Sequence, residues 1–257
     1  MLPKVEPFAL LRIALSLVAV LLAAPAALPA GSGTCEKISE ADLSYTICTF
    51  DVRQARLRLF LADSGGRPYG GFGAIDAALR PQGDVLAFAM NAGMFRPDFR
   101  PAGLYVEAGR QISPANTRAG PGKFHMKPNG VFYFDSQAAG IMETSRFLKS
   151  GLKPEYATQS GPMLVIGGQL HPKIEASGTS AKIRNGVGVK DGHIVVFAIS
   201  EEPVTFYQFA TLFRDRLACP DALFLDGSVS SLYAPEVGRD DGLLPLGPIV
   251  GVVEKAQ

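Results

Sequence analysis

The sequence predicts an α+β protein, with a mixed, strand-rich sheet core and a few flanking helices in a single domain. Short apolar runs that end in Gly, Asn or Asp recur along the chain, which is typical of strands. Helical periodicity is confined to two segments, 72–79 and 205–217. No Pro-rich or Ser-rich linker divides residues 31–257, and this length is sufficient for one large core.

The strands follow from two apolar patterns. Residues 56–61 alternate apolar and polar, as in a half-buried strand, whereas residues 85–90 form a continuous apolar run, as in a buried one. Asp191-Gly192 marks a hairpin turn. The predicted strands are residues 45–51, 56–61, 85–90, 131–134, 163–166, 187–189, 194–199 and 222–225.

The clearest predicted helix covers residues 205–217. Its apolar residues lie on one helical face, and Thr205 with Gln208 fits a capping box at the first turn. Pro220 closes the segment. This helix leads directly into the strand at 222–225, so the two form a helix-to-strand unit.

The N-terminal residues 1–30 read as a signal peptide. Lys4 and Arg12 precede the apolar run 13–27, and small residues with Pro25 and Pro29 follow. The alternative is an uncleaved anchor, but the apolar run is shorter than the roughly 20 residues that span a bilayer. We therefore expect a periplasmic or secreted protein with no stable membrane insertion after cleavage.

Charge and cysteine usage narrow the class further. Lys+Arg and Asp+Glu number 25 and 24, and no basic tract is present, which argues against a nucleic-acid partner. In an oxidising compartment Cys35 and Cys48 are expected to form a disulfide that holds the N-terminal strand. Cys219 is then left as a buried structural thiol.

The stretch 222–233 holds the most informative candidate residue. The apolar run 222–225 ends at Asp226, followed by Gly227 and the hydroxyls of Ser228 and Ser230. Taken alone, this pattern fits a strand-ending Asp-Gly turn better than a site. The alternative is a carboxylate that meets a ligand at the strand edge, beside hydroxyl donors and a glycine that permits close approach.

Other polar residues stand at strand boundaries. Asn91, Asn129 and Asn185 are each followed by small residues, which fits either simple turns or a pocket of amides suited to sugar hydroxyls. Arg184 precedes a strand, where it is either a solvated surface residue or a clamp for phosphate or carboxylate. The three histidines are scattered, and there is no G-x-S-x-G, P-loop or His-Glu-x-x-His motif.

Five blocks in order resemble the phosphodiester glycosidase family across roughly residues 45–250. They are Met90-Asn91-Ala92-Gly93-Met94-Phe95, Lys127-Pro128-Asn129-Gly130-Val131-Phe132, Gln159-Ser160-Gly161-Pro162-Met163-Leu164, Arg184-Asn185-Gly186-Val187-Gly188-Val189 and Leu225-Asp226-Gly227-Ser228-Val229-Ser230. Ala92, Asn185 and Ser228 depart from the family's usual residues, which bears on the substrate more than on the fold.

The resemblance implies hydrolysis of a sugar that is linked through its anomeric carbon to a phosphodiester, or of a related phosphate-linked envelope glycan. In the mechanism that follows from it, Asp226 and Arg184 carry catalysis. No cofactor and no firm metal ligands are expected, with a divalent cation held by Asp226 and nearby carbonyls as the open alternative. Asp226 is expected to act as nucleophile, as base for water or as a holder of sugar hydroxyls. The implied substrate-binding residues are Asn91, Gly93, Phe95, Asn129, Ser160, Asn185, Gly227, Ser228 and Ser230.

Two other functions remain open from the sequence. One is a non-catalytic envelope protein that binds glycans through its Asn, Ser and Tyr233 side chains; the other is hydrolysis of another polymer such as exopolysaccharide. Most glycosidases use a second carboxylate. Glu107 is the best candidate for that group that the sequence offers.

Overall fold

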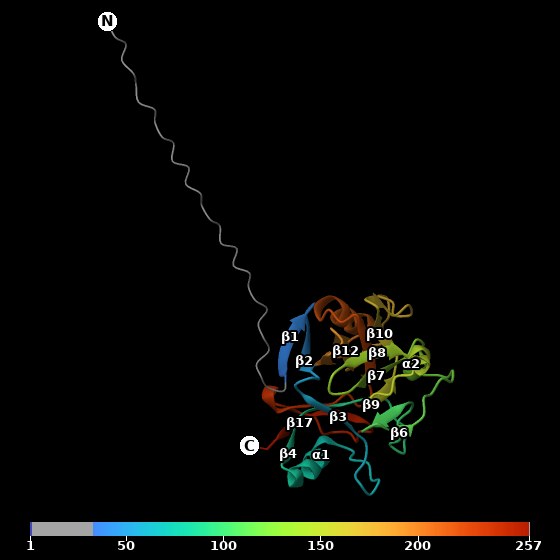
Figure 1. The fold of residues 1–257 in the computed structure, drawn as a ribbon. Coiled ribbons are helices and arrows are strands. Elements are labelled where there is room, and N and C mark those ends of the chain that lie inside the picture. The colour runs from blue at the N-terminus through green and yellow to red at the C-terminus, as the bar shows by residue number, and fades with distance from the viewer. Residues whose placement is uncertain (2–32, 257) are drawn as a thin grey trace.

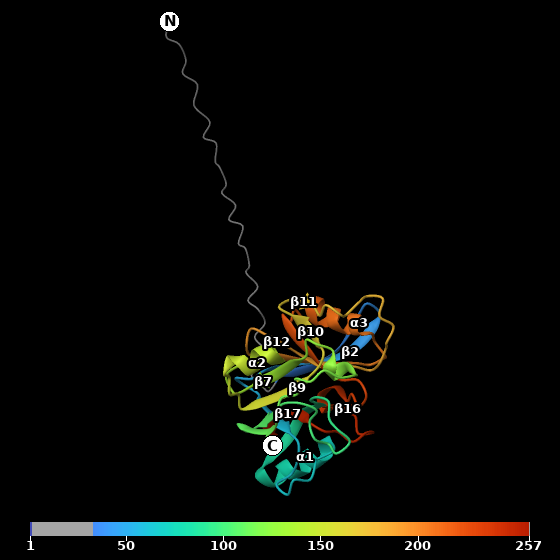
Figure 2. The same ribbon diagram turned by 90° about the vertical axis from the view of Figure 1, so that its right-hand side faces the viewer.

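The computed structural model describes Met1 and residues 33–256. The expected signal peptide, residues 1–30, lies outside the described residues except for Met1. The described strands form three sheets, here called sheets A, B and C, with helices packed on their outer faces (Figures 1 and 2). The α+β, strand-rich class predicted from the sequence is confirmed.

Sheet A is the largest of the three sheets and has seven strands. In spatial order it consists of β1 (Thr34–Glu40), β2 (Leu43–Asp51), β13 (Ile194–Ser200), β12 (Asn185–Lys190), β14 (Asp221–Asp226), β10 (Met163–Ile166) and β11 (Gln169–Leu170). Cys35 and Cys48 are directly opposite in the β1–β2 pair and form a disulfide, as predicted.

Sheets B and C have five strands each. Sheet B consists of β16 (Arg239–Asp240), β15 (Leu232–Ala234), β4 (Asp84–Asn91), β17 (Ile249–Lys255) and β3 (Arg56–Phe60). Sheet C consists of β6 (Arg110–Ser113), β5 (Tyr105–Glu107), β9 (Tyr156–Ser160), β7 (Gly130–Phe134) and β8 (Ala139–Glu143).

The expected mixture of parallel and antiparallel strands is corrected by the structure. Every pairing between described strands is antiparallel. Several neighbours, such as β1–β2, β7–β8 and β12–β13, are joined by short turns, and a short turn connects only antiparallel strands. The predicted helix-to-strand unit leads from α3 (Phe206–Thr211) into β14. It does not create a parallel pair, because both neighbours of β14, β10 and β12, run antiparallel to it.

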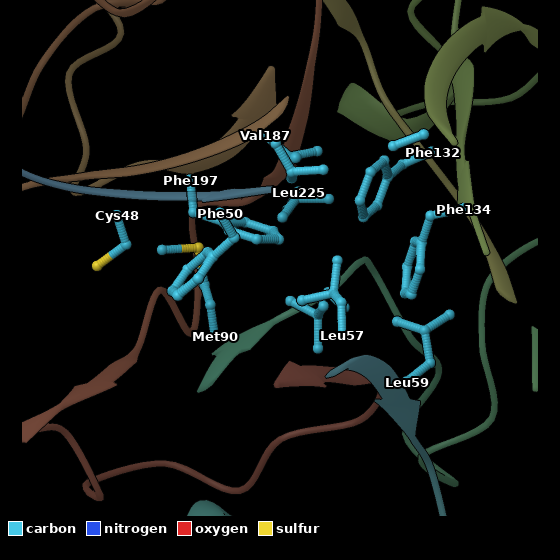
Figure 3. Close-up of a cluster of buried hydrophobic side chains, with 14 of the residues drawn as sticks. Cys48, Phe50, Leu57, Leu59, Met90, Phe132, Phe134, Val187, Phe197 and Leu225 are labelled. Atoms are coloured by element: carbon cyan, nitrogen blue, oxygen red, sulfur yellow. The ribbon is translucent and has the colours of Figure 1, made fainter. Parts of the chain in front are cut away.

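The main core lies where the three sheets face one another (Figure 3). Phe50 and Phe197 project from sheet A, Leu57 and Met90 from sheet B, and Phe132 from sheet C. Each alternates with residues that point to the other face of its strand, as the pleat requires. The buried runs predicted at 85–90 and 222–225 therefore supply part of one shared core.

Three α-helices cover the outer faces of the sheets. They are α1 (Phe72–Leu79), α2 (Thr144–Ser150) and α3 (Phe206–Thr211), beside the short helical turns Arg80–Gln82, Lys123–His125, Leu212–Arg216 and Pro235–Val237. In Figure 2, α3 lies at the top beside β10 and α1 at the bottom. The bounds of α1 match the predicted segment 72–79.

The predicted helix 205–217 is shorter and less regular than expected. Its capping box is present, with Gln208 N donating to Thr205 Oγ1 and Thr205 N donating to Gln208 Oε1. After Thr211 the chain widens into a π-helical turn, in which Leu217 N donates to Leu212 O at 3.0 Å. Phe213 remains buried against the outer face of sheet A, whereas Leu217 is only half-buried.

Candidate active site

Asp226 is the last residue of β14, an inner strand of sheet A. Its Oδ1 accepts hydrogen bonds from the backbone N–H groups of Gly227 and Ser228, the latter at 2.6 Å. Among the described residues, both of these hydrogen bonds are made to Oδ1, and none of comparable geometry is made to Oδ2. The side chain lines a cavity although the residue is only 6% exposed. One carboxylate oxygen is therefore fixed by the turn and the other is left for a ligand.

Burial is the main influence on the acidity of this carboxyl group. Loss of solvation raises the pKa of Asp226, because water no longer stabilises the charged form. The backbone N–H groups of residues 227–229 and the charge of Lys182 oppose that rise. A carboxylate with a raised pKa is a better proton acceptor than an ordinary surface aspartate.

Arg184 reaches the same cavity because of strand register. It directly precedes β12, and the next residue, Asn185, is the register partner of Asp226. Arg184 Nε donates to Val204 O at 2.9 Å, and one Nη donates to Ser180 O at 2.7 Å. Its guanidinium carbon lies 3.6 Å from the centre of the Phe206 ring. These contacts fix the guanidinium plane, leaving its other Nη group without a partner among the described residues.

The charge of Arg184 is not balanced by an ion pair. No carboxylate oxygen of the described residues lies within salt-bridge distance of it, although it is only 2% exposed. Burial lowers the pKa of Arg184 to about 10, so the group stays charged at neutral pH. A buried, unpaired guanidinium at a cavity wall is suited to an anionic ligand.

The cavity itself has a volume of about 370 Å³ and a net positive lining. Lys123 and Lys182 join Arg184 in its wall, against the single carboxylate of Asp226. Phe95 and Phe224 add apolar surface. Gly227 and Ser228 also line the cavity and present backbone close to the ligand space. The arrangement can hold a small anionic group beside a reactive carboxylate.

Asn91 and Asn185 lie behind Asp226 and do not line the cavity. Asn185 Oδ1 accepts a hydrogen bond from Asp226 N at 3.1 Å, and Asn185 Nδ2 donates to Asn91 Oδ1 at 2.9 Å. Asn91 Oδ1 also accepts from Ser231 N at 2.9 Å. Both asparagines are 0% exposed. Asn91 comes from sheet B and Asn185 from sheet A, so this pair ties the two sheets together under the loop 226–231.

Other residues expected at the site have internal partners. Ser230 Oγ donates to Ile183 O and Ser160 Oγ to Leu225 O, at 3.2 and 2.9 Å. Asn129 donates through Nδ2 to Phe124 O and accepts through Oδ1 from the Thr144 hydroxyl. Gly93 has φ +149°, and a Cβ there would lie 3.0 Å from Thr158 Oγ1. In the described structure these groups hold the ends of the strands around the cavity.

Glu107 does not line this cavity. It accepts a hydrogen bond from the Tyr105 hydroxyl at 2.8 Å, and burial raises the pKa of its carboxyl group. Tyr233 lies in a separate cluster, with its ring 6.1 Å from that of Phe72. The structure therefore does not place either residue beside Asp226.

A second hollow of about 770 Å³ adjoins the first on the other side of the loop 227–229. Its charged wall residues are the carboxylates of Glu201, Asp240 and Asp241 and the two cations Lys182 and Arg239. Arg239 bridges two of the carboxylates, donating to Glu201 and to Asp241, whereas Asp240 has no ion pair in the described chain. Sequence reasoning missed this acidic wall; its signal was the Asp-Asp pair at 240–241.

The one free cysteine of the described residues is buried and unreactive. Burial raises the pKa of the Cys219 thiol to about 12, which keeps it protonated and unreactive. Across residues 33–256, no three His, Cys, Asp or Glu side chains come close enough to hold a metal ion. No helix in that range has the length and hydropathy to cross a membrane.

Comparison with known proteins identifies the class. The profile of the phosphodiester glycosidase family matches residues 84–244. The uncharacterized protein YigE of Escherichia coli K12 is 34% identical over 196 residues, which cover 76% of each chain. The chain belongs to the phosphodiester glycosidase family.

Two solved structures show the same fold. The zebrafish N-acetylglucosamine-1-phosphodiester alpha-N-acetylglucosaminidase catalytic domain, auto-inhibited by its pro-peptide, superposes with a TM-score of 0.57 at 12% identity, over 86% of this chain and 82% of that one. A hypothetical protein from Synechocystis gives a TM-score of 0.53 at 14% identity, over 86% of this chain and 61% of that one.

Proposed function

We propose that this protein hydrolyses the glycosidic bond of a sugar whose anomeric carbon is joined to a phosphodiester. The observation that carries the proposal is the meeting of Asp226 and the unpaired Arg184 in one positively charged cavity. Membership of the phosphodiester glycosidase family supports the same substrate class. The zebrafish enzyme of the same fold is named for an N-acetylglucosamine-1-phosphodiester, which fits this substrate class.

In this proposal the phosphate occupies the cationic cavity. Arg184, Lys123 and Lys182 would neutralise it as the bond to the sugar breaks. The leaving group is a phosphate monoester with a second pKa of about 6, so it can depart with little protonation. This explains how one carboxylate can suffice where ordinary glycosidases use two.

Asp226 then acts toward the sugar. Its free oxygen would attack the anomeric carbon or take a proton from the attacking water, while the turn N–H groups hold its other oxygen. Overall, the hydroxyl of water joins the anomeric carbon and the bond from that carbon to the phosphate oxygen breaks. The proton of the water passes to solvent or, below a pH of about 6, to the phosphate monoester. The acidic hollow beyond the loop 227–229 would accept hydrogen bonds from sugar hydroxyls through Asp240 and its neighbours.

The site of action is proposed to be outside the cytoplasm. A Cys35–Cys48 disulfide persists in an oxidising compartment and is uncommon in the cytosol. The apolar N-terminal run with its flanking charges fits export. The protein would then meet phosphate-linked glycans of the cell envelope.

Substitution of the two central residues tests the proposal. With a synthetic sugar-1-phosphodiester, we expect Asp226→Asn to lower kcat by about 1,000-fold or more, because loss of a catalytic carboxylate or its activation removes several kcal/mol of transition-state stabilisation. Arg184→Lys should lower kcat about 100-fold, since a point charge cannot replace the fixed guanidinium. Product release is followed by chromatography, and folding by circular dichroism.

Lys149→Ala is the matched control, because this exposed lysine lies on α2 and lines neither hollow. Its turnover should equal that of the wild type. Equal turnover by wild type, Asp226→Asn and Arg184→Lys would refute the assignment of both residues. Glycan binding without any product, unchanged in Asp226→Asn, would instead favour a non-catalytic binding protein.

A further inference from the structure

A basic groove lies beside the proposed active site and takes no part in the chemistry described above. It has a volume of about 480 Å³ and is lined by Arg96, Arg100 and Arg118, with Asn116 and Thr117 between them. Arg100 pairs with Asp98, whereas Arg96 and Arg118 form no ion pair with any described residue. Two free guanidinium groups therefore face a polar groove.

The surrounding sequence is strongly one-sided in charge. Residues 108–134 contain Arg110, Arg118, Lys123 and Lys127 but no Asp or Glu, although the whole chain is nearly balanced, with 25 basic and 24 acidic residues. Since nearby carboxylates are few, the positive potential here is not cancelled locally. An anionic ligand is the chemistry that this surface favours.

The groove and the active-site cavity share two segments. The loop 94–102 closes on itself, with Ala102 N donating to Met94 O; Phe95 lines the cavity and Arg96, the next residue, lines the groove. Similarly, Lys123 lines the cavity and Arg118 the groove, and His125 Nδ1 contacts Arg118 O at 3.1 Å. The cavity and the groove are thus lined by neighbouring residues of the same two segments.

The walls of the groove are held in place by buried side chains. Gln159, which is 2% exposed, accepts hydrogen bonds through Oε1 from Leu104 N and Asn116 N and donates through Nε2 to Asn116 O. Asn116 Nδ2 in turn donates to Ala102 O at 3.0 Å. Hydrogen bonds therefore connect the loop 94–102 to the segment that carries Arg118, so the backbone from which both guanidinium groups extend is held in place.

We propose that this groove, through Arg96 and Arg118, binds a second phosphate group on the aglycone side of the substrate. The proposal rests on the proposed function, since the first phosphate occupies the cavity beside Arg184. It identifies the substrate class as a chain with repeated phosphates instead of a single isolated phosphodiester. The sugar, the scissile phosphate and the second phosphate would then lie in the acidic hollow, the cavity and the groove, in that order.

Two substrates and two double variants test the proposal. The substrates are sugar-1-phosphodiesters of an alkanediol that ends either in a free hydroxyl or in a phosphate, prepared with several linker lengths. For at least one linker, wild type should show a kcat/KM about 10-fold higher for the phosphate-ended substrate, as expected for a charge-assisted hydrogen bond. Arg96→Ala/Arg118→Ala should lose that preference but keep the wild-type rate on the hydroxyl-ended substrate.

Lys149→Ala/Lys153→Ala is the matched control, because it removes the same charge from exposed positions that line neither hollow nor groove. It should retain the preference. A preference that survives in Arg96→Ala/Arg118→Ala, or that is absent from wild type at every linker length, would overturn the proposal.

A binding measurement separates this proposal from the proposed function. Calorimetric titration of the full chain with the alkanediol bisphosphates needs no turnover. Should the protein cleave no substrate, a binding constant that weakens about 10-fold in Arg96→Ala/Arg118→Ala but not in the control would still support the groove. Equal binding by all three proteins, or none by wild type, would refute it.

Discussion

Asp226 combines a buried position with the charge that the proposed function requires. The turn N–H groups satisfy one oxygen, and among the described residues no hydrogen bond of comparable geometry is made to the other. Burial raises the pKa of this group, so the folded state disfavours the carboxylate relative to the unfolded chain. Catalytic residues commonly lower stability in this way.

Removal of this charge should therefore stabilise the protein. Above the raised pKa, the folded wild type holds a penalised carboxylate, and Asp226→Asn should gain about 1 kcal/mol of unfolding free energy. The folded state binds more protons than the unfolded state between the ordinary and the raised pKa, so the contribution of Asp226 to stability falls as pH rises through that window. Below it both states are protonated, and the gain should vanish.

Urea unfolding of wild type and Asp226→Asn across acid to neutral pH measures this difference. Glu107→Gln is a useful comparison, because burial also raises the pKa of Glu107, outside the cavity. A stability difference for Asp226→Asn that grows on acidification would contradict the account.

At the residue scale, the sequence motifs identified residues at the cavity but did not predict their contacts. Asp226 and Arg184 line one cavity because Asn185, which follows Arg184, pairs with Asp226. From the sequence, only the order of the motifs indicated that these two residues belong to one site. That Asn91 and Asn185 bond each other behind the cavity depends on how the ends of two sheets meet, which local sequence does not encode. Lys123 begins a short helical turn with no distinctive pattern, and the Asp-Asp pair at 240–241 does not by itself indicate which site it joins.

At the element scale, glycines allow the outer helix to approach sheet A. A Cβ on Gly188 in β12 would lie 2.6 Å from Cys219 Sγ and 2.9 Å from the Phe213 ring. The π-helical turn Leu212–Arg216 brings Phe213 to this point. Close packing of strand and helix here sets the position of the strand that follows, β14, and so of Asp226.

Gly188→Ala should accordingly destabilise the protein by about 1–3 kcal/mol, the usual cost of overpacking a well-filled core. Gly73→Ala is the matched control: it lies inside α1 with no neighbour within 4 Å, and alanine there should add about 0.5–1 kcal/mol. Thermal unfolding of both variants checks the two signs. A Gly188→Ala protein as stable as wild type would show that the helix is not seated as described.

The elements that sequence analysis found were those with clear local signals. Apolar runs identified β4, β10 and β14, and the capping box identified the start of α3. The strands β5, β15 and β16 have three residues or fewer, too short for a period to appear. Their structure comes from pairing with distant segments, which is a property of the tertiary fold.

At the scale of the whole molecule, the site exists because three sheets converge. The ends of β4, β9 and β14 come from sheets B, C and A, and their residues Asn91, Ser160 and Asp226 lie close to one another or to shared partners. The core between the sheets holds those ends in fixed positions (Figure 3). Antiparallel pairing throughout, not foreseen from the sequence, places strand starts beside strand ends at this edge.

The three hollows of the site region differ in the charge of their lining residues. An acidic hollow, a cationic cavity and a basic groove follow one another, joined by the loop 227–229 on one side and the loop 94–102 on the other. A neutral sugar followed by phosphates matches this order. If the proposed function is right, the bond that breaks joins the anomeric carbon to the phosphate oxygen, in the space between the acidic hollow and the cationic cavity.

Hydrolysis of a sugar-1-phosphodiester in water enriched in oxygen-18, followed by mass spectrometry of both products, tests this claim most directly. Attack at the anomeric carbon, assisted by Asp226, places the label in the sugar hydroxyl and none in the phosphate monoester. Attack at phosphorus would place the label in the phosphate product. We expect label in the sugar alone, and label in the phosphate would refute the proposed function.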